Sequence, residues 1–219
     1  MNYLGSKGGS GVYQAIINLM PPHDTYIEPF FGSGSIFEKK APALKSICID
    51  LDKEIIKRKK NTEQVEFICA NSIEWLANFN PVDKVLLYVD PPYVHSTRTS
   101  NAQYKHEMTD NDHRQLLKVL KDIKAYVLIS GYRNSIYDEL IGDWYNMDFQ
   151  AMTRGGVRTE TVWCNFNPGA IHYHTYAGKN FTDRQRIKRK AERWSKKFQS
   201  LPTDERQAVL AAILATNIS

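Results

Sequence analysis

The feature that most constrains the fold is the apolar run that begins at Lys84 and ends at Tyr93 with the sequence Lys-Val-Leu-Leu-Tyr-Val-Asp-Pro-Pro-Tyr. Its consecutive β-favouring residues predict a buried strand. Pro91 and Pro92 must end this strand, because neither residue can donate a backbone N–H to a neighbouring strand. Asp90 is therefore expected at the carboxyl end of a strand, where open α/β sheets bind their ligands.

The residues at this strand end predict the chemistry of what binds there. Asp90 and the Pro91 carbonyl are hydrogen-bond acceptors held by a rigid Pro91-Pro92 turn, and the Tyr93 ring offers a face for stacking. Such a site suits a flat amino group, for example the exocyclic amine of a nucleobase. The alternative interpretation is a strand that ends in a rigid turn with a surface tyrosine.

A second strand–turn–helix unit near the N-terminus predicts a nucleotide site. The strand Tyr26–Phe31 is followed by Gly32-Ser33-Gly34 and a helix that begins near Ile36. Glycines at such a turn let backbone N–H groups approach a ligand. Asp50 ends the next predicted strand, at the position where nucleotide-binding α/β folds accept hydrogen bonds from ribose hydroxyls. Phe37 replaces the third glycine of a GxGxxG motif, which disfavours a fold of the NAD type.

The alternation of strands and helices predicts the fold class. Further strands are expected over 65–70, 125–130, 144–152 and 159–166, and a helix that Ser72 caps is expected after the first of them. Short connections between alternating strands and helices predict a mainly parallel sheet covered on both faces. Cys48, Cys69 and Cys164 lie in strand-like runs, so we expect buried, reduced thiols.

Composition predicts the cellular location of the protein and the kinds of ligand that it does not bind. The chain has 219 residues, enough for one core and a small appendage, and it contains neither a long apolar span nor an apolar N-terminal segment. We therefore expect a cytoplasmic protein without membrane contact. The close pair His172 and His174 is interpreted as loop or strand edge, and no metal site is expected.

Three polar segments are candidates for nucleic-acid contact. Residues 94–108 lack apolar periodicity and are interpreted as a mobile flap; residues 153–158 form a predicted hairpin tip; and the helix from about 182 to 200, capped by Thr182 or Asp183, is strongly basic. From Arg184 to Lys197 there are eight Lys or Arg and one acid, whereas the net charge of the whole chain is +5. Solvated surfaces are the alternative for all three. The candidate residues are Arg98, Tyr104, Lys105, His106, Arg154, Arg158, Arg184, Arg186, Lys188 and Arg189.

A set of motifs in order carries a family resemblance. It comprises Tyr3-x-Gly5-x-Lys7, Glu28-Pro29-Phe30-x-Gly32-x-Gly34, Asp50, Asp90-Pro91-Pro92-Tyr93, Thr109-x-x-Asp112-His113-x-x-Leu116 and Glu160-x-x-Trp163-x-Asn165-Phe166. Over about residues 1–166 the chain thus resembles the Dam-type (D12 class) N6-adenine-specific DNA methyltransferases, particularly small members from phages and prophages.

The resemblance implies a Rossmann-like α/β fold with a seven-stranded, mostly parallel sheet that has one antiparallel strand. It also implies methyl transfer from S-adenosylmethionine to the 6-amino group of an adenine in DNA. The catalytic residues are then Asp90, Pro91, Pro92 and Tyr93. The candidate cofactor-binding residues are Tyr3, Lys7, Glu28, Phe30, Gly32, Gly34, Asp50, Asn71 and Asp90.

One departure from the family concerns sequence recognition. Members closest to Dam carry a target-recognition domain between the glycine motif and Asp90, whereas here residues 35–89 are filled by predicted strands and helices. We expect a methyltransferase domain at 1–170, a basic helical tail at 171–219, a monomer or weak dimer, and a short or degenerate target. The alternatives are an RNA adenine methyltransferase and a non-catalytic nucleic-acid-binding protein of the same fold.

Overall fold

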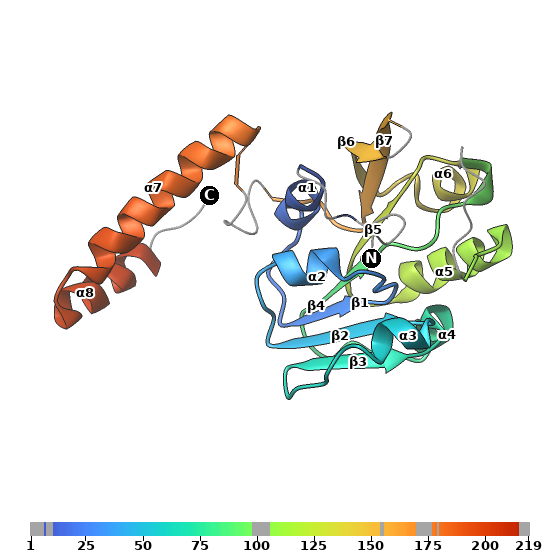
Figure 1. Ribbon diagram of the computed structural model, residues 1–219, viewed down its shortest axis with the longest axis horizontal. Coiled ribbons are helices and arrows are strands. Elements are labelled where there is room, and N and C mark those ends of the chain that lie inside the picture. Colours follow the sequence, from blue (N-terminus) through green and yellow to red (C-terminus); the bar gives the residue numbers. More distant parts are fainter. Residues whose placement is uncertain are drawn as a thin grey trace. The chain divides into compact units, whose positions relative to one another are not determined.

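The computed structural model describes residue 7 and residues 11–97, 106–153, 156–169, 177–178 and 180–214 (Figure 1). The chain divides into two compact units, Met1–His174 and Thr175–Ser219. Several residues with predicted roles lie outside the described residues; they are Tyr3, Arg98, Tyr104, Lys105, Arg154, His172 and His174.

A seven-stranded sheet forms the centre of the first unit, in the order β3-β2-β1-β4-β5-β7-β6. The first five strands in this order are parallel, and β7 is antiparallel to both of its neighbours. This arrangement confirms the predicted fold class. The strands are β1 (Thr25–Glu28), β2 (Lys45–Asp50), β3 (Val65–Cys69), β4 (Val85–Val89), β5 (Tyr126–Gly131), β6 (Tyr145–Thr153) and β7 (Gly156–Cys164).

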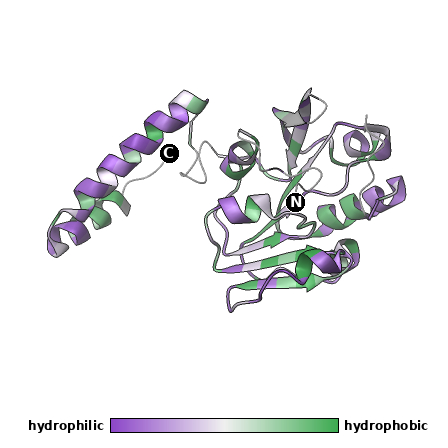
Figure 2. Cartoon of the chain, in the orientation of Figure 1, coloured by the Kyte–Doolittle hydropathy of each residue, from purple (hydrophilic) through white to green (hydrophobic). Residues whose placement is uncertain are grey.

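Hydrophobic alternation decides which sheet face packs on which helices. One core cluster contains Ile27, Ile49 and Val89, which lie on the neighbouring strands β1, β2 and β4. The same cluster contains Leu76 of α4 and Leu116 of α5, so this face of the sheet is covered by helices that also pack on one another. Figure 2 shows the many hydrophobic residues of the central strands and the mixture of hydrophilic and hydrophobic residues in the helices. The helices of this unit are α1 (Val12–Asn18), α2 (Ser35–Lys39), α3 (Lys53–Ile56), α4 (Ser72–Ala77), α5 (Asp110–Asp122) and α6 (Ser135–Ile141), with a short 3-10 helix, η1 (His95–Thr97).

Three local predictions were wrong in the sheet unit. Strand β6 ends at Thr153 and β7 begins at Gly156, so Arg158 lies within β7 and not in a hairpin tip of residues 153–158. Helix α4 is capped by Asn71, whose side chain accepts hydrogen bonds from the N–H groups of Ile73 and Glu74, because the Ser72 hydroxyl instead donates to the carbonyl of Pro29. Cys69 is exposed rather than buried, because β3 is an edge strand with one neighbour; Cys48 and Cys164 are buried as predicted.

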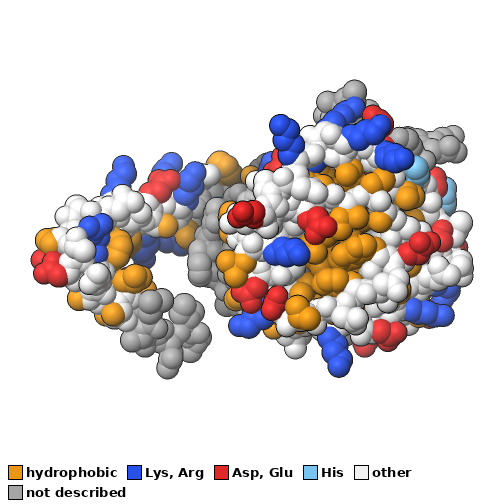
Figure 3. Space-filling view, turned by 90° about the horizontal axis from the view of Figure 1, so that it is seen from below, with side chains coloured by type: hydrophobic (Ala, Val, Ile, Leu, Met, Phe, Trp, Pro, Cys, Tyr) orange, Lys and Arg blue, Asp and Glu red, His pale blue; other side chains and the backbone are white. Residues whose placement is uncertain are grey.

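The second unit consists of helix α7 (Phe181–Gln199) and helix α8 (Thr203–Leu214). The N-cap of α7 is Asn180, which lies two residues before Thr182 and three before Asp183, the predicted caps, and its side chain accepts from the Asp183 N–H. No α7 residue is buried. Basic side chains are spread along this unit, whereas hydrophobic, acidic and basic side chains mix on the visible face of the sheet unit (Figure 3). Among the described residues, no helix is both long and apolar enough to span a lipid bilayer.

Candidate active site

Three acidic side chains lie on one face of the sheet, at the carboxyl ends of parallel strands, because side chains alternate along strands. Ile27, Ile49 and Val89 face the α4 and α5 side, so the residues that follow them point to the opposite face. These residues are Glu28, Asp50 and Asp90, at the carboxyl ends of β1, β2 and β4. Strands β1 and β4 are neighbours at the point where the strand order reverses direction, the position at which open α/β sheets bind ligands.

The glycine turn after β1 is shaped by positive φ angles and by Asp50. Gly32 has φ +50° and Gly34 has φ +69°, a region that favours glycine. A Cβ atom at Gly34 would lie 2.3 Å from the Phe31 ring, so no other residue fits there without movement. The Gly32 N–H donates to Asp50 Oδ2 over 2.8 Å, and the Asp52 N–H donates to Oδ1 over 2.8 Å. Burial raises the pKa of Asp50, while these two backbone hydrogen bonds lower it.

A cavity of about 310 Å³ lies between the glycine turn and the end of β4. It brings together most of the described residues that were predicted to bind cofactor or substrate. Gly34 does not line it but shapes the turn, and three described residues of the predicted flap, His106, Glu107 and Met108, do line it. The predicted residues in its lining are Lys7, Glu28, Phe30, Gly32, Asp50, Asn71, Asp90, Pro91, Pro92, Tyr93 and His106.

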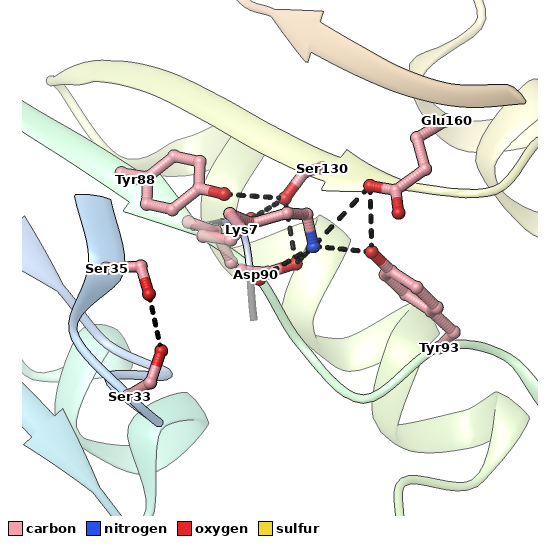
Figure 4. Close-up of polar contacts among 9 residues, drawn as sticks. Lys7, Ser33, Ser35, Tyr88, Asp90, Tyr93, Ser130 and Glu160 are labelled. Carbon is pink, nitrogen blue, oxygen red and sulfur yellow. Dashed lines mark hydrogen bonds and ion pairs between the residues drawn. The ribbon is translucent and has the colours of Figure 1, made fainter. Parts of the chain in front are cut away.

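The Lys7 ammonium group lies at the centre of the site, with only 4% of the residue exposed (Figure 4). Its Nζ donates to Asp90 Oδ1 over 2.6 Å and to Oδ2 over 2.8 Å, and to the Tyr93 hydroxyl oxygen over 2.5 Å. Burial acts to lower the pKa of Lys7, but the charges of Asp90 and Glu160 more than offset this and raise it. Lys7 is therefore a charged ammonium that is paired with buried carboxylates.

Sequence reasoning gave no role to Ser130 and Glu160. Val89 pairs with Ile129 in the parallel register of β4 and β5, so Ser130 lies beside Asp90, and its hydroxyl donates to Asp90 Oδ1 over 2.9 Å. The Tyr93 hydroxyl donates to Glu160 Oε2 over 3.1 Å, and the same oxygen lies 3.6 Å from Lys7 Nζ. Glu160 begins the motif Glu160-x-x-Trp163-x-Asn165-Phe166, but only the strand order brings it to this end of the parallel strands.

Glu28 is the most strongly perturbed acid of the site. It is buried on β1 and accepts a hydrogen bond from the Tyr26 hydroxyl over 2.7 Å. Burial raises its pKa to about 8; the hydrogen bond from Tyr26 opposes this shift, and the charge of Asp90 adds to it. At this pKa the carboxyl group is largely protonated at neutral pH.

A second hollow has a volume of about 500 Å³ and is lined in part by Tyr132, which contacts Tyr93 of the first cavity. Tyr132 lies between the two, with its ring centre 4.6 Å from that of Tyr93 and 5.6 Å from the Arg158 guanidinium. The lining includes the polar residues Ser96, Arg133 and Thr159. Arg158 is thus linked to Tyr93 through the Tyr132 ring. The other described candidates for nucleic-acid contact, Arg184, Arg186, Lys188 and Arg189, lie on α7 in the second unit.

Comparison with known proteins gives one family match. Residues 44–159 match the family described as D12 class N6 adenine-specific DNA methyltransferase, which is more than half of the chain. The matched segment contains Asp50, Asp90 and Tyr93, whereas Lys7 and the glycine turn precede it. No curated protein matches the chain.

Solved structures similar to this chain are remote in sequence. The N-methyltransferase NodS from Bradyrhizobium japonicum WM9, in complex with S-adenosyl-L-homocysteine, is 12% identical with TM-score 0.46; the match covers 69% of this chain and 83% of that one. Spermidine synthase from Thermotoga maritima is 12% identical with TM-score 0.46, over 70% of this chain and 60% of that one. A precorrin-8w decarboxylase from Methanobacterium thermoautotrophicum is 14% identical with TM-score 0.45, over 71% and 89%.

Proposed function

Because this chain belongs to the D12 class N6 adenine-specific DNA methyltransferase family, we propose that it methylates the 6-amino group of adenine in DNA. Its seven-stranded sheet has the Rossmann-like arrangement of S-adenosylmethionine-dependent methyltransferases. The observation that carries the proposal is the position of Asp90. Its carboxylate lines the cavity at the switch point of the sheet and holds a cationic amine, Lys7 Nζ, over 2.6 Å.

The cavity residues suit S-adenosylmethionine in their chemistry. Asp50 keeps lone pairs for ribose hydroxyls, since each of its oxygens accepts one backbone hydrogen bond. Asp90 lines the same cavity as a carboxylate, and a ligand with a positive centre would also favour the ionised form of Glu28. Gly32 lets the backbone approach the ligand. When bound, S-adenosylmethionine supplies a sulfonium methyl group whose carbon–sulfur bonding pair passes to sulfur as the carbon–nitrogen bond forms.

The residues after β4 would prepare the target nitrogen. The lone pair of an adenine 6-amino group is delocalised into the ring, so this nitrogen is a poor nucleophile. Hydrogen bonds from the amino group to Asp90 and to the Pro91 carbonyl favour a more tetrahedral nitrogen with a localised lone pair, and they fix its direction. After transfer the nitrogen carries a positive charge, and Asp90 would accept a proton from it.

The site also implies how DNA is held. An adenine inside a duplex cannot reach a cavity beside Asp90, so the base is flipped out and stacks against Tyr93. Arg158, in the hollow next to Tyr93, suits a phosphate of the flanking backbone, and the basic residues of α7 suit further phosphates. His106 lines the cavity and would lie near the flipped base.

The test uses the purified chain with labelled S-adenosylmethionine on mixed-sequence duplex DNA, single-stranded DNA and RNA. We expect N6-methyladenine in DNA, and single-molecule sequencing of the product should show a short or degenerate context of one or two bases beside the adenine. Methylation confined to a motif of four or more base pairs would refute the weak specificity. Preferential methylation of RNA would show that RNA, and not DNA, is the substrate. No transfer to any adenine would overturn the proposed function.

A further inference from the structure

The Lys7 ammonium occupies the acceptor atoms that the target amine needs. An ammonium group has three N–H donors. Two of them are directed at the two oxygens of Asp90 and one at the Tyr93 hydroxyl oxygen. Ser130 takes a further lone pair on Asp90 Oδ1. A carboxylate offers about four lone-pair sites, so Asp90 has little capacity left for a second amine.

Lys7 therefore has to leave Asp90 when the target amine binds, and burial limits where it can go. With 4% of the residue exposed, Lys7 cannot stay charged in the site without a paired anion except at a large cost. The buried carboxylate within reach is Glu160, whose Oε2 lies 3.6 Å from Nζ, beyond a hydrogen bond but inside ion-pair range. Both groups already contact the same Tyr93 hydroxyl.

We propose that Glu160 is a positioning residue that receives the Lys7 ammonium from Asp90 when the target amine enters the site. This inference rests on the proposed function, because it requires an amine that competes for Asp90. The exchange keeps one cation paired with one anion at each stage. It also frees both Asp90 oxygens for the amino group, and it removes a positive charge that weakens Asp90 as an acceptor.

The exchange has a kinetic signature. Glu160→Gln keeps a hydrogen-bond acceptor for the Tyr93 hydroxyl but removes the negative charge, so Lys7 stays on Asp90. We expect kcat to fall about 10-fold or more, within the range of coupling between residues of one network. The KM for S-adenosylmethionine should change little, because Glu160 does not line the cofactor cavity. Glu160→Asp, which keeps the charge, should recover part of the loss.

A double-mutant cycle in the full-length chain tests whether Glu160 acts through Lys7. In a Lys7→Met background there is no ammonium to receive, so Glu160→Gln should change kcat less than about 2-fold. Lys7→Gln provides a second background if Lys7→Met does not fold. The matched control is Glu66→Gln, an exposed strand glutamate on β3, which should leave kcat unchanged.

The outcomes separate the inference from the function on which it rests. Equal effects of Glu160→Gln in the wild-type and Lys7-substituted backgrounds, or a normal kcat in the single variant, would overturn the exchange while adenine methylation stands. If Glu160→Gln raised the KM for S-adenosylmethionine and left kcat unchanged, this result would also overturn the exchange. If the wild-type chain methylates no adenine, the proposed function fails, and the exchange fails with it.

Discussion

The charges of the cavity and the charges of α7 show how burial changes what a charged residue does. Lys7 is buried and has donors directed at Asp90 and Tyr93, and the side chain of Glu160 beside it is 7% exposed. None of the eight basic residues of α7 is buried, and the described ion pairs there, such as Arg186 with Asp183, are local and exposed. Buried charges require specific partners, whereas exposed ones are screened by water and salt.

The two regions therefore suit different tasks: the buried cluster positions atoms, and the exposed helix attracts an oppositely charged partner. The buried cluster fixes a few atoms to within hydrogen-bond distance, as catalysis requires. The helix carries an excess of positive charge over a long exposed surface, which favours a polyanion without fixing its position. Changes in the first region are therefore expected to alter turnover and stability, and changes in the second to alter salt-dependent affinity.

The largest expected effect is on turnover and comes from Asp90→Ala. Loss of the carboxylate removes the acceptor for the target amine, and we expect kcat to fall by about 10³-fold, the upper end for one preorganised polar group. DNA affinity should be largely retained, as gel shift or anisotropy can measure. The control is Asp83→Ala, which changes an exposed aspartate just before the N-terminal end of β4. Normal turnover of the Asp90 variant would remove Asp90 from the mechanism.

The next effect concerns α7. Replacing Arg189, Lys190, Arg193 and Lys196 by glutamine should lower the slope of log affinity against log salt by about 3 to 4, since each phosphate contact contributes about 0.9. Turnover at saturating DNA should change little. The control carries four exposed lysines of the sheet unit changed to glutamine, namely Lys60, Lys84, Lys118 and Lys124. Equal slopes for both variants would make α7 a solvated helix without a DNA contact.

The smallest effect is a change in the pH dependence of stability. The pKa of Glu28 is about 8 in the folded chain, against about 4.5 when exposed, so the folded state holds a proton that the unfolded state has lost between these values. The free energy of unfolding should therefore decrease as pH rises through this window, by at most about 1.4 kcal/mol per pH unit.

Glu28→Gln tests this, because glutamine does not ionise yet can still accept from the Tyr26 hydroxyl. Relative to wild type, its unfolding free energy should increase from pH 5 to pH 8, as urea titrations at fixed pH can measure. Glu66→Gln, at an exposed site on β3, provides the comparison. Parallel pH profiles for wild type and Glu28→Gln would show that Glu28 titrates normally.

The sequence by itself determined the parts of the molecule that depend on local chemistry. Proline geometry ended β4 and placed Asp90 at a strand end, and the glycines after β1 together with Asp50 indicated a nucleotide cavity. Periodicity gave the strands and the basic helix. These signals act over a few residues, through backbone sterics and side-chain alternation, and they do not require a known strand order.

Only the tertiary structure decided which distant groups meet. Lys7 and Asp90 are 83 positions apart, and Tyr93 and Glu160 are 67 apart; the strand order and the antiparallel register of β7 bring them together. The same holds for Ser130 beside Asp90, for the exposure of Cys69 on an edge strand, and for the choice of Asn71 over Ser72 as a cap. Each outcome depends on neighbours contributed by other parts of the chain, and no local pattern specifies those neighbours.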